Sequence, residues 1–178
     1  MKKLIITMVV LMVIIAIFYI VNLKSAMKNL SLDVKATCEN GVEDGEGNKM
    51  CVFEGKDIFL DIKITNNDRA VVGFPLEYLQ KTGPIIKLTN FNTGAETYVP
   101  INLADRALAD KFTPIQPGNL VSIKWMISSS DLGRIDSHLT AEIIVKTIIQ
   151  TGGNEVEFMG MDRMIIAGNR GPRTDKEQ

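Results

Sequence analysis

Residues 57–68, DIFLDIKITNND, carry the clearest structural signal in the sequence. Four apolar residues, Ile58, Leu60, Ile62 and Ile64, alternate with aromatic, acidic and basic ones. Because successive side chains of a strand point to opposite faces, this period of two predicts a β-strand with one buried face. The Asn-Asn-Asp run that closes the segment has turn chemistry, so we expect the strand to end there.

Similar extended segments recur on both sides of this strand. They cover residues 31–39, 51–53, 70–79, 84–91, 96–102, 120–128, 139–150 and 155–167. Turn residues separate them, most clearly at residues 92–94 and 151–154, which predict hairpins. Only residues 103–112, LADRALADKF, have a helical pattern outside the N-terminal region. Roughly seven to nine short strands with almost no helix predict an all-β antiparallel β-sandwich around one core.

The order of these segments resembles the immunoglobulin-like β-sandwich domains of bacterial and archaeal cell envelopes. Residues 55–68, 114–127 and 139–148 carry the resemblance: a strand ending in an Asn-rich turn, then a Pro-Gly turn and a strand with one aromatic residue. The resemblance covers residues 31–167 and implies an immunoglobulin-like sandwich. We expect Trp125 on the buried face of its strand, because Ile123 and Ile127 flank it at a spacing of two.

Residues 4–21, LIITMVVLMVIIAIFYIV, form a second strong signal. They contain no charge, Pro or Gly, and with the next two residues they reach the roughly 20 that a membrane-spanning helix needs. Lys2 and Lys3 precede them, which favours a cytoplasmic N-terminus. We therefore expect a single-pass signal-anchor over residues 1–30, an extracytoplasmic sandwich over 31–168 and a disordered tail over 169–178. The alternative is a cleaved secretory signal, which leaves the same sandwich outside the membrane.

The charge content argues against one class of partner, and the cysteines agree with an outer location. Beyond residue 30 the chain has 16 basic and 21 acidic residues, a net charge of −5, and this argues against nucleic acid as a partner. Cys38 and Cys51 are the only cysteines, and an oxidising compartment would favour a disulfide between them. Two buried free thiols are the alternative.

Two segments offer weak candidate metal ligands. Met159, Met161 and Met164 lie on one predicted strand, and thioether sulfurs suit Cu(I). If Val156 and Phe158 point into the core, Met159 and Met161 point to solvent together. An anchored outer sandwich is also the layout of the copper chaperones that serve cytochrome oxidase, but this chain lacks their Cys-x-Cys motif.

An acidic loop supplies the second set of candidate ligands. Asp44, Glu46 and Asn48 place oxygen atoms at alternate positions, as calcium loops do. Lys49 stands where such loops have Gly, and the Glu that usually completes the site is missing. A solvated acidic loop closed by the disulfide is the simpler interpretation. Neither set defines a metal site, so we expect no cofactor.

The sequence gives little support to catalysis. His138 is the only histidine, and no nucleophile motif or phosphate-binding loop accompanies it. The pattern favours a non-catalytic binding or assembly module that is tethered to the membrane and docks onto a protein partner of the cell envelope. A metal-handling envelope protein is the alternative, and an envelope enzyme using His138 is a third hypothesis.

Overall fold

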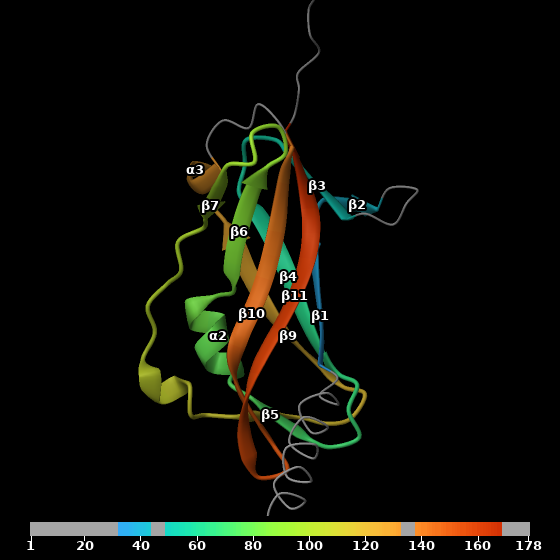
Figure 1. The fold of residues 1–178 in the computed structure, drawn as a ribbon, viewed down its shortest axis with the longest axis vertical. Helices are drawn as coiled ribbons and strands as arrows, with labels where there is room; N and C mark the ends of the chain where they lie inside the picture. The colour runs from blue at the N-terminus through green and yellow to red at the C-terminus, as the bar shows by residue number, and fades with distance from the viewer. Residues whose placement is uncertain (1–31, 44–48, 133–137, 169–178) are drawn as a thin grey trace, which may run out of the picture. The chain divides into compact units, whose positions relative to one another are not determined.

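The computed structural model describes residues 32–43, 49–132 and 138–168 (Figure 1). The chain divides into two compact units, Met1–Ser31 and Leu32–Gln178, and all described residues belong to the second. The expected anchor, part of the acidic loop and the expected tail lie outside the described residues. Within the described part, no helix is long and apolar enough to span a membrane.

Eleven strands and three short helices make up the described chain. In order they are β1 (Leu32–Cys38), β2 (Gly41–Glu43), β3 (Lys49–Phe53), β4 (Ile58–Asn66), β5 (Val72–Phe74), α2 (Leu76–Thr82), β6 (Ile85–Asn90), β7 (Glu96–Tyr98), the 3-10 helix η1 (Arg106–Leu108), β8 (Thr113–Ile115), β9 (Leu120–Ile127), α3 (Ser129–Leu132), β10 (Leu139–Thr151) and β11 (Asn154–Gly168).

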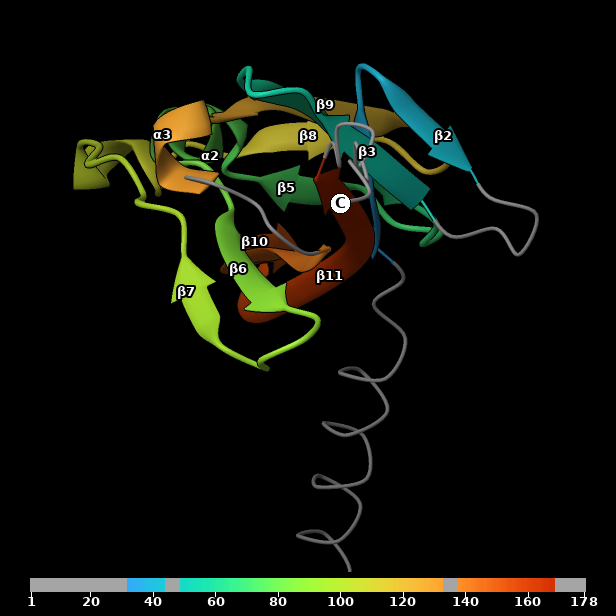
Figure 2. The ribbon, with the colours of Figure 1, turned by 90° about the horizontal axis from the view of Figure 1, so that it is seen from above.

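The strands form two sheets, as the all-β prediction requires. The smaller sheet has the order β1-β4-β9. The larger sheet runs β2-β3-β11-β10, and β10 then pairs with β6 along one part of its length and with β5 at its end. Strand β7 pairs with β6, and β8 pairs with β5. Figure 2 shows β9 on the opposite side of the fold from β10 and β11.

One strand pair departs from the antiparallel prediction. β3 runs parallel to β11, with Cys51 opposite Ile166. The chain reaches β3 from β1, which belongs to the other sheet, through the β2–β3 hairpin. Because parallel neighbours cannot be joined by a tight turn, local hairpin signals contain no information about this pairing.

The alternating residues of β4 form the centre of the core, as predicted. Ile62 and Ile64 are 0% exposed, and Ile58 and Leu60 are nearly so. Fully buried residues of β10 and β11 face them from the other sheet: Ala141, Ile143, Val145, Ile149 and Ile166. The hairpin predicted at residues 151–154 connects these two strands, with Thr151 opposite Asn154.

One local prediction was wrong. Residues 76–79, the end of a segment expected to be extended, belong to helix α2, whereas residues 103–112 contain one short helical turn, η1, where a helical pattern was predicted. Pro75 lies just before α2 and Gly83 just after it, which is the usual placement of these residues around a helix. The apolar residues of this segment fit a helix as well as a strand, and the flanking Pro75 and Gly83 favour the helix.

The two sheets meet along β1 and β11. The backbone N–H of Ala36 in β1 donates to the Asp162 carboxylate of β11 over 2.6 Å, and Lys49 of β3 forms an ion pair with the same carboxylate. Gly160 lies against Val34, and a Cβ at this position would overlap the valine side chain. The unpaired edge of β1 is therefore covered by the larger sheet.

A disulfide reinforces this junction. It joins Cys38, at the end of β1, to Cys51 in β3, with 6.1 Å between the Cα atoms. The bond therefore links the two sheets as well as closing the loop that contains the acidic residues. Met164 is buried beside it, with its sulfur 3.5 Å from the Cys51 sulfur.

Removing the disulfide should destabilise the sandwich. For a closed loop of this length the chain-entropy estimate gives a loss of about 3 kcal/mol in the free energy of unfolding. The measurement is chemical denaturation of the full chain in detergent, comparing wild type with the Cys38→Ala/Cys51→Ala double variant. Dithiothreitol should shift the wild-type midpoint and leave the double variant unchanged. Equal midpoints for wild type and the double variant would contradict the expectation.

Candidate interaction surfaces

The candidate metal ligands do not converge. Met159 and Met161 project from the outer face of β11 and are 71% and 48% exposed, whereas Met164 points into the core at 2%. Asp44, Glu46 and Asn48 lie outside the described residues. Among the residues that the structure describes, no three His, Cys, Asp or Glu side chains gather in a metal-binding group.

His138 lies directly before β10 and belongs to no metal-binding group among the described residues. Its backbone carbonyl accepts a hydrogen bond from the N–H of Phe91 over 3.0 Å, which fixes the loop after β6. This contact involves the main chain only, so it gives the imidazole no chemical role.

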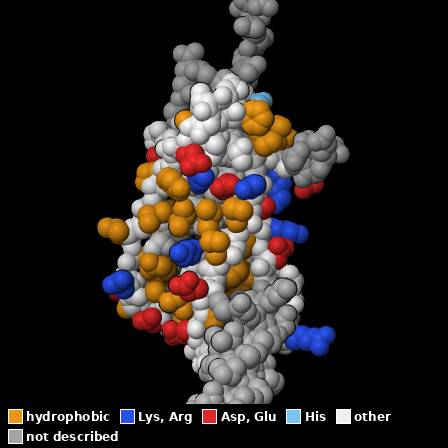
Figure 3. Space-filling model, viewed as in Figure 1, with side chains coloured by type: hydrophobic (Ala, Val, Ile, Leu, Met, Phe, Trp, Pro, Cys, Tyr) orange, Lys and Arg blue, Asp and Glu red, His pale blue; other side chains and the backbone are white. Residues whose placement is uncertain are grey.

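The two exposed methionines belong to a larger apolar surface on the outer face of the larger sheet. In the strand register Ile85 of β6 lies opposite Ile144 of β10, which lies opposite Met161 of β11. Exposed side chains continue this surface along the same strands: Ile148, Met159 and, on β7, Tyr98. We call these residues the methionine face. Figure 3 shows hydrophobic side chains gathered here, with charged groups among and around them.

A row of ion pairs borders the methionine face on one side. Glu142 of β10 accepts from Arg163 of β11 over 2.7 Å and lies 3.9 Å from Lys87 of β6, which also contacts Glu96 at 2.6 Å. The hydrogen bond to Glu96 is the largest effect that raises the pKa of Lys87 above its usual value. On the other side Lys146, opposite Met159, is exposed.

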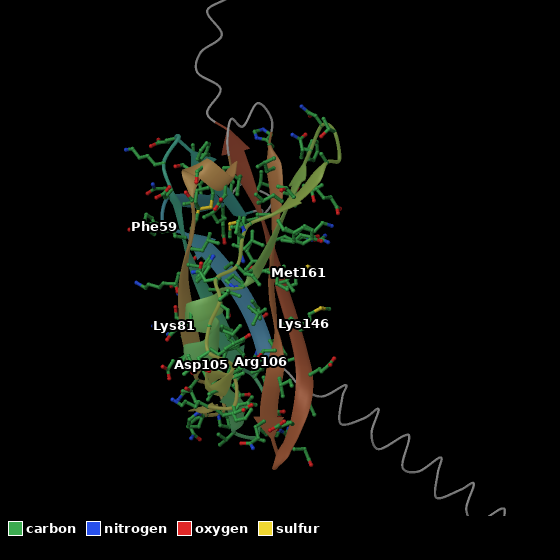
Figure 4. All side chains as sticks on the ribbon, turned by 90° about the vertical axis from the view of Figure 1, so that its left-hand side faces the viewer. Phe59, Lys81, Asp105, Arg106, Lys146 and Met161 are labelled. Carbon is green, nitrogen blue, oxygen red and sulfur yellow. A yellow bond between two sulfur atoms is a disulfide. The ribbon has the colours of Figure 1, made fainter. Side chains whose placement is uncertain are left out.

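A second surface lies on the opposite layer. A groove of about 760 Å³ crosses the outer face of the smaller sheet and continues around the edge of β9. Eleven residues line it: Thr37, Cys38, Glu39, Phe59, Leu60, Asp61, Gln80, Asn102, Lys124, Trp125 and Met126. We call it the edge groove. Figure 4 shows Phe59 on one side of the fold and Met161 with Lys146 on the other.

The edge groove exposes an unpaired strand. β9 pairs only with β4, and within the described residues its outer edge makes no backbone hydrogen bond. The N–H of Ala36, which lies opposite Ile62, points away from β4. In an antiparallel ladder the backbone groups of Ile62 then point the other way, towards β9, where Ile62 lies opposite Ile123. The backbone groups of Ile123 therefore point back towards β4, and those of its two neighbours point outwards. The backbone groups of Ser122, Lys124 and Met126 therefore point out of the sheet.

Apolar and polar groups lie on either side of this free edge. Phe59 and Met126 are cross-strand neighbours on the outer face and are 52% and 44% exposed. Gln80 of α2 and Asn102 form the other wall of the groove. The arrangement combines free backbone donors and acceptors with an aromatic anchor and carboxamides, which suits the binding of an extended peptide.

Trp125 occupies an intermediate position. Its indole ring packs against Gly83 at the C-terminal end of α2, and the residue is half-buried and lines the edge groove. The prediction of an inward-pointing side chain is correct, but the residue is not fully covered. The sequence predicted β9 but not the groove beside it. Gln80 and Asn102 line the groove, and their positions depend on α2, whose first residues were expected to be extended.

Comparisons with known proteins assign no family. No family model matches the chain, and no curated protein matches it. A Northeast Structural Genomics Consortium target, SoR45, has a TM-score of 0.38 and 10% identity, covering 85% of this chain and 93% of that one. A protein from Archaeoglobus fulgidus has a TM-score of 0.37 and 13% identity, covering 77% of this chain and 97% of that one. A β-glucosidase from Erythrobacter marinus has a TM-score of 0.32 and 10% identity, covering 78% of this chain and 16% of that one.

Proposed function

We propose that this protein is a membrane-tethered, extracytoplasmic docking module that binds an extended segment of a partner protein of the cell envelope through the edge groove. It is non-catalytic, and its body is an immunoglobulin-like sandwich behind a single-pass signal-anchor. The apolar run at residues 4–21 supports the anchor, and the Cys38–Cys51 bond agrees with an oxidising compartment.

The open edge of β9 is the observation that carries this proposal. An eight-residue strand with free outward N–H and C=O groups is a template for an added strand. Native sheets usually cover or blunt such edges, and here a lysine, Lys124, stands in the middle of the exposed run. That lysine discourages non-specific edge-to-edge pairing and still leaves room for a partner strand with an acidic or polar residue opposite it.

The side chains of a bound segment would alternate between two environments. Residues on the outer face would meet Phe59 and Met126, which offer an apolar contact beside the charge of Lys124. Residues on the inner face would meet Trp125 and the carboxamides of Gln80 and Asn102. Main-chain hydrogen bonds would supply affinity, and this alternation would supply specificity.

The Lys124→Pro variant should lose the partner. Proline removes the outward N–H and places its ring where the added strand would lie, while the bonds between β9 and β4 come from the neighbouring residues. We expect recovery of the partner from detergent-solubilised membranes, measured by quantitative mass spectrometry, to fall at least about tenfold, since a buried unpaired carbonyl on the partner adds about 1–3 kcal/mol.

Lys124→Ala is the matched control, because it removes the same charge and keeps the N–H. It should retain most of the recovery, and both variants should melt within a few degrees of wild type. Proteins lost with Lys124→Pro and kept with Lys124→Ala identify the partner. Equal recovery with both variants, or recovery of the bait alone from wild type, would exclude strand addition at β9.

A further inference from the structure

The methionine face has a charge pattern that is complementary to itself. Its centre is the row Ile85, Ile144 and Met161, which crosses three strands of the larger sheet. Two residues away along β10 in one direction lies Glu142, and two residues away in the other lies Lys146. The same face therefore presents an anion and a cation at equal distances from one apolar row.

We propose that a second copy of this chain docks on the methionine face, face to face, about a two-fold axis that runs along the central row. Such an axis places β10 over β10 of the other copy. Ile144 then meets its own counterpart, and Glu142 of each copy faces Lys146 of the other. Residues two apart on a strand are about 7 Å apart, so Glu142 and Lys146 lie about 7 Å on either side of Ile144. Stacked sheets are about 10 Å apart, a distance that the long side chains of Glu142 and Lys146 can span together.

The charges select this axis over the obvious alternative. A two-fold axis parallel to β10 would place Glu142 over Glu142 and Lys146 over Lys146, and would bring Lys87 close to Arg163 of the other copy. Every one of these pairs joins like charges, which oppose association. The axis along the apolar row creates two opposite-charge pairs and no facing pair of like charges on β10, with Lys87 and Arg163, which contact Glu142 in their own chain, beside each pair.

The composition of the surface favours a second copy over a foreign protein. Cations and anions occur together on the same face, Lys87, Lys146 and Arg163 with Glu96, Glu142 and Glu157, so no single-sign partner is complementary to it. A closed two-fold interface is isologous, which requires a patch to complement itself. An apolar centre ringed by charged groups is also the usual organisation of a stable interface.

Self-association and docking use different surfaces. Met161 and Lys146 lie on the opposite side of the fold from Phe59 of the edge groove (Figure 4). A dimer formed through the methionine face would therefore leave both β9 edges free for partners. The inference is independent of the proposed function, and it adds that each assembly presents two grooves.

A charge-swap experiment on the full chain in detergent tests the interface. Lys146→Glu places glutamate against Glu142, and Glu142→Lys places lysine against Lys146, so each variant alone should dimerise at least about tenfold more weakly than wild type in sedimentation velocity. When the two variants carry different tags and are mixed in equal amounts, both charge pairs are restored. The mixture should therefore form a heterodimer about as stable as the wild-type dimer.

Lys63→Glu is the matched control, because it reverses an exposed lysine on the smaller sheet and should leave the dimer unchanged. A cooperative melting transition would show that each variant folds, and Glu142→Lys should melt below wild type because it also loses the pairs with Arg163 and Lys87 in its own chain. A monomeric wild type, single variants that dimerise like wild type, or a mixture that stays monomeric would each overturn the proposal. Partner recovery by Lys146→Glu at wild-type levels would show that docking survives without the dimer.

Discussion

Replacing Gly83 with alanine is expected to lower the free energy of unfolding by about 4 kcal/mol. Gly83 ends α2 with φ of 78° and ψ of 174°, a region that is almost restricted to glycine and costs another residue about 1–3 kcal/mol. A Cβ there would also overlap the indole of Trp125. Forcing a methyl group into a packed site adds about 1–3 kcal/mol.

Gly94→Ala separates these two contributions. Gly94 also has a positive φ, 69°, but a Cβ there meets nothing within 4 Å. Its substitution should therefore cost only the backbone strain, about 1–2 kcal/mol. Denaturation of both full-length variants can be followed by fluorescence of Trp125, the only tryptophan in the chain. If both variants lose the same stability, the close packing of the indole on Gly83 is wrong.

The same substitution should affect the edge groove. Because Trp125 lines the groove and packs on Gly83, displacing the ring would change the wall that α2 forms. The helix and the free edge of β9 are therefore coupled through the contact between Trp125 and Gly83. The tryptophan expected in the core is only half-buried, because it packs on the helix and also lines the groove.

The strands that could be predicted are those with local signals. β4 has an uninterrupted period of two, and β10 and β11 join at a glycine turn, so sequence alone located all three. The parallel pairing of β3 with β11 has no local signal, since it depends on β1 crossing to the other sheet. α2 was missed because its apolar residues fit a strand as well as a helix.

The two surfaces depend on register, which the sequence does not contain. The alternation along β11 predicted that Met159 and Met161 would be exposed together, but not that Ile144 and Ile85 would extend the same row. Likewise, nothing in the sequence of β9 reveals that one of its edges is unpaired. An isolated strand pattern specifies which face is apolar and leaves the neighbours of the strand undetermined.

Replacing Asn66 with alanine is expected to cost about 4 kcal/mol. Asn66 is 0% exposed, and its side-chain amide donates to the carbonyls of Ala70 and Ile115, each over 2.8 Å. Its side-chain oxygen accepts from the N–H of Asp68 over 2.9 Å. Alanine would leave three polar groups without a partner, at about 1–3 kcal/mol for each one that water does not reach.

These bonds connect the end of β4 to the nearby segment before β5 and to the distant strand β8. Asn66 ends β4, Ala70 precedes β5 and Ile115 ends β8, so the amide links the smaller sheet to the β5–β8 end of the larger one. The backbone of Asn66 also bonds to Gly118 and Asn119, at the turn that leads into β9. Loss of the side chain should therefore loosen the start of the strand that carries the edge groove.

Asn67→Ala is the control, because Asn67 lies in the same turn and is exposed. It should change the free energy of unfolding by less than about 0.5 kcal/mol.

Asn66→Asp provides a test by pH. Its ionised carboxylate would be buried and would face two carbonyl oxygens. Both effects disfavour the charged form, so the folded-state pKa of Asp should rise above the usual value near 3.9. The variant should then be most stable below that value and lose stability as the pH rises through the folded-state pKa, since only the protonated acid can donate a hydrogen bond. An Asn66→Asp variant whose stability relative to wild type does not change between pH 4 and pH 7 would show that the amide is not the donor to Ala70 and Ile115.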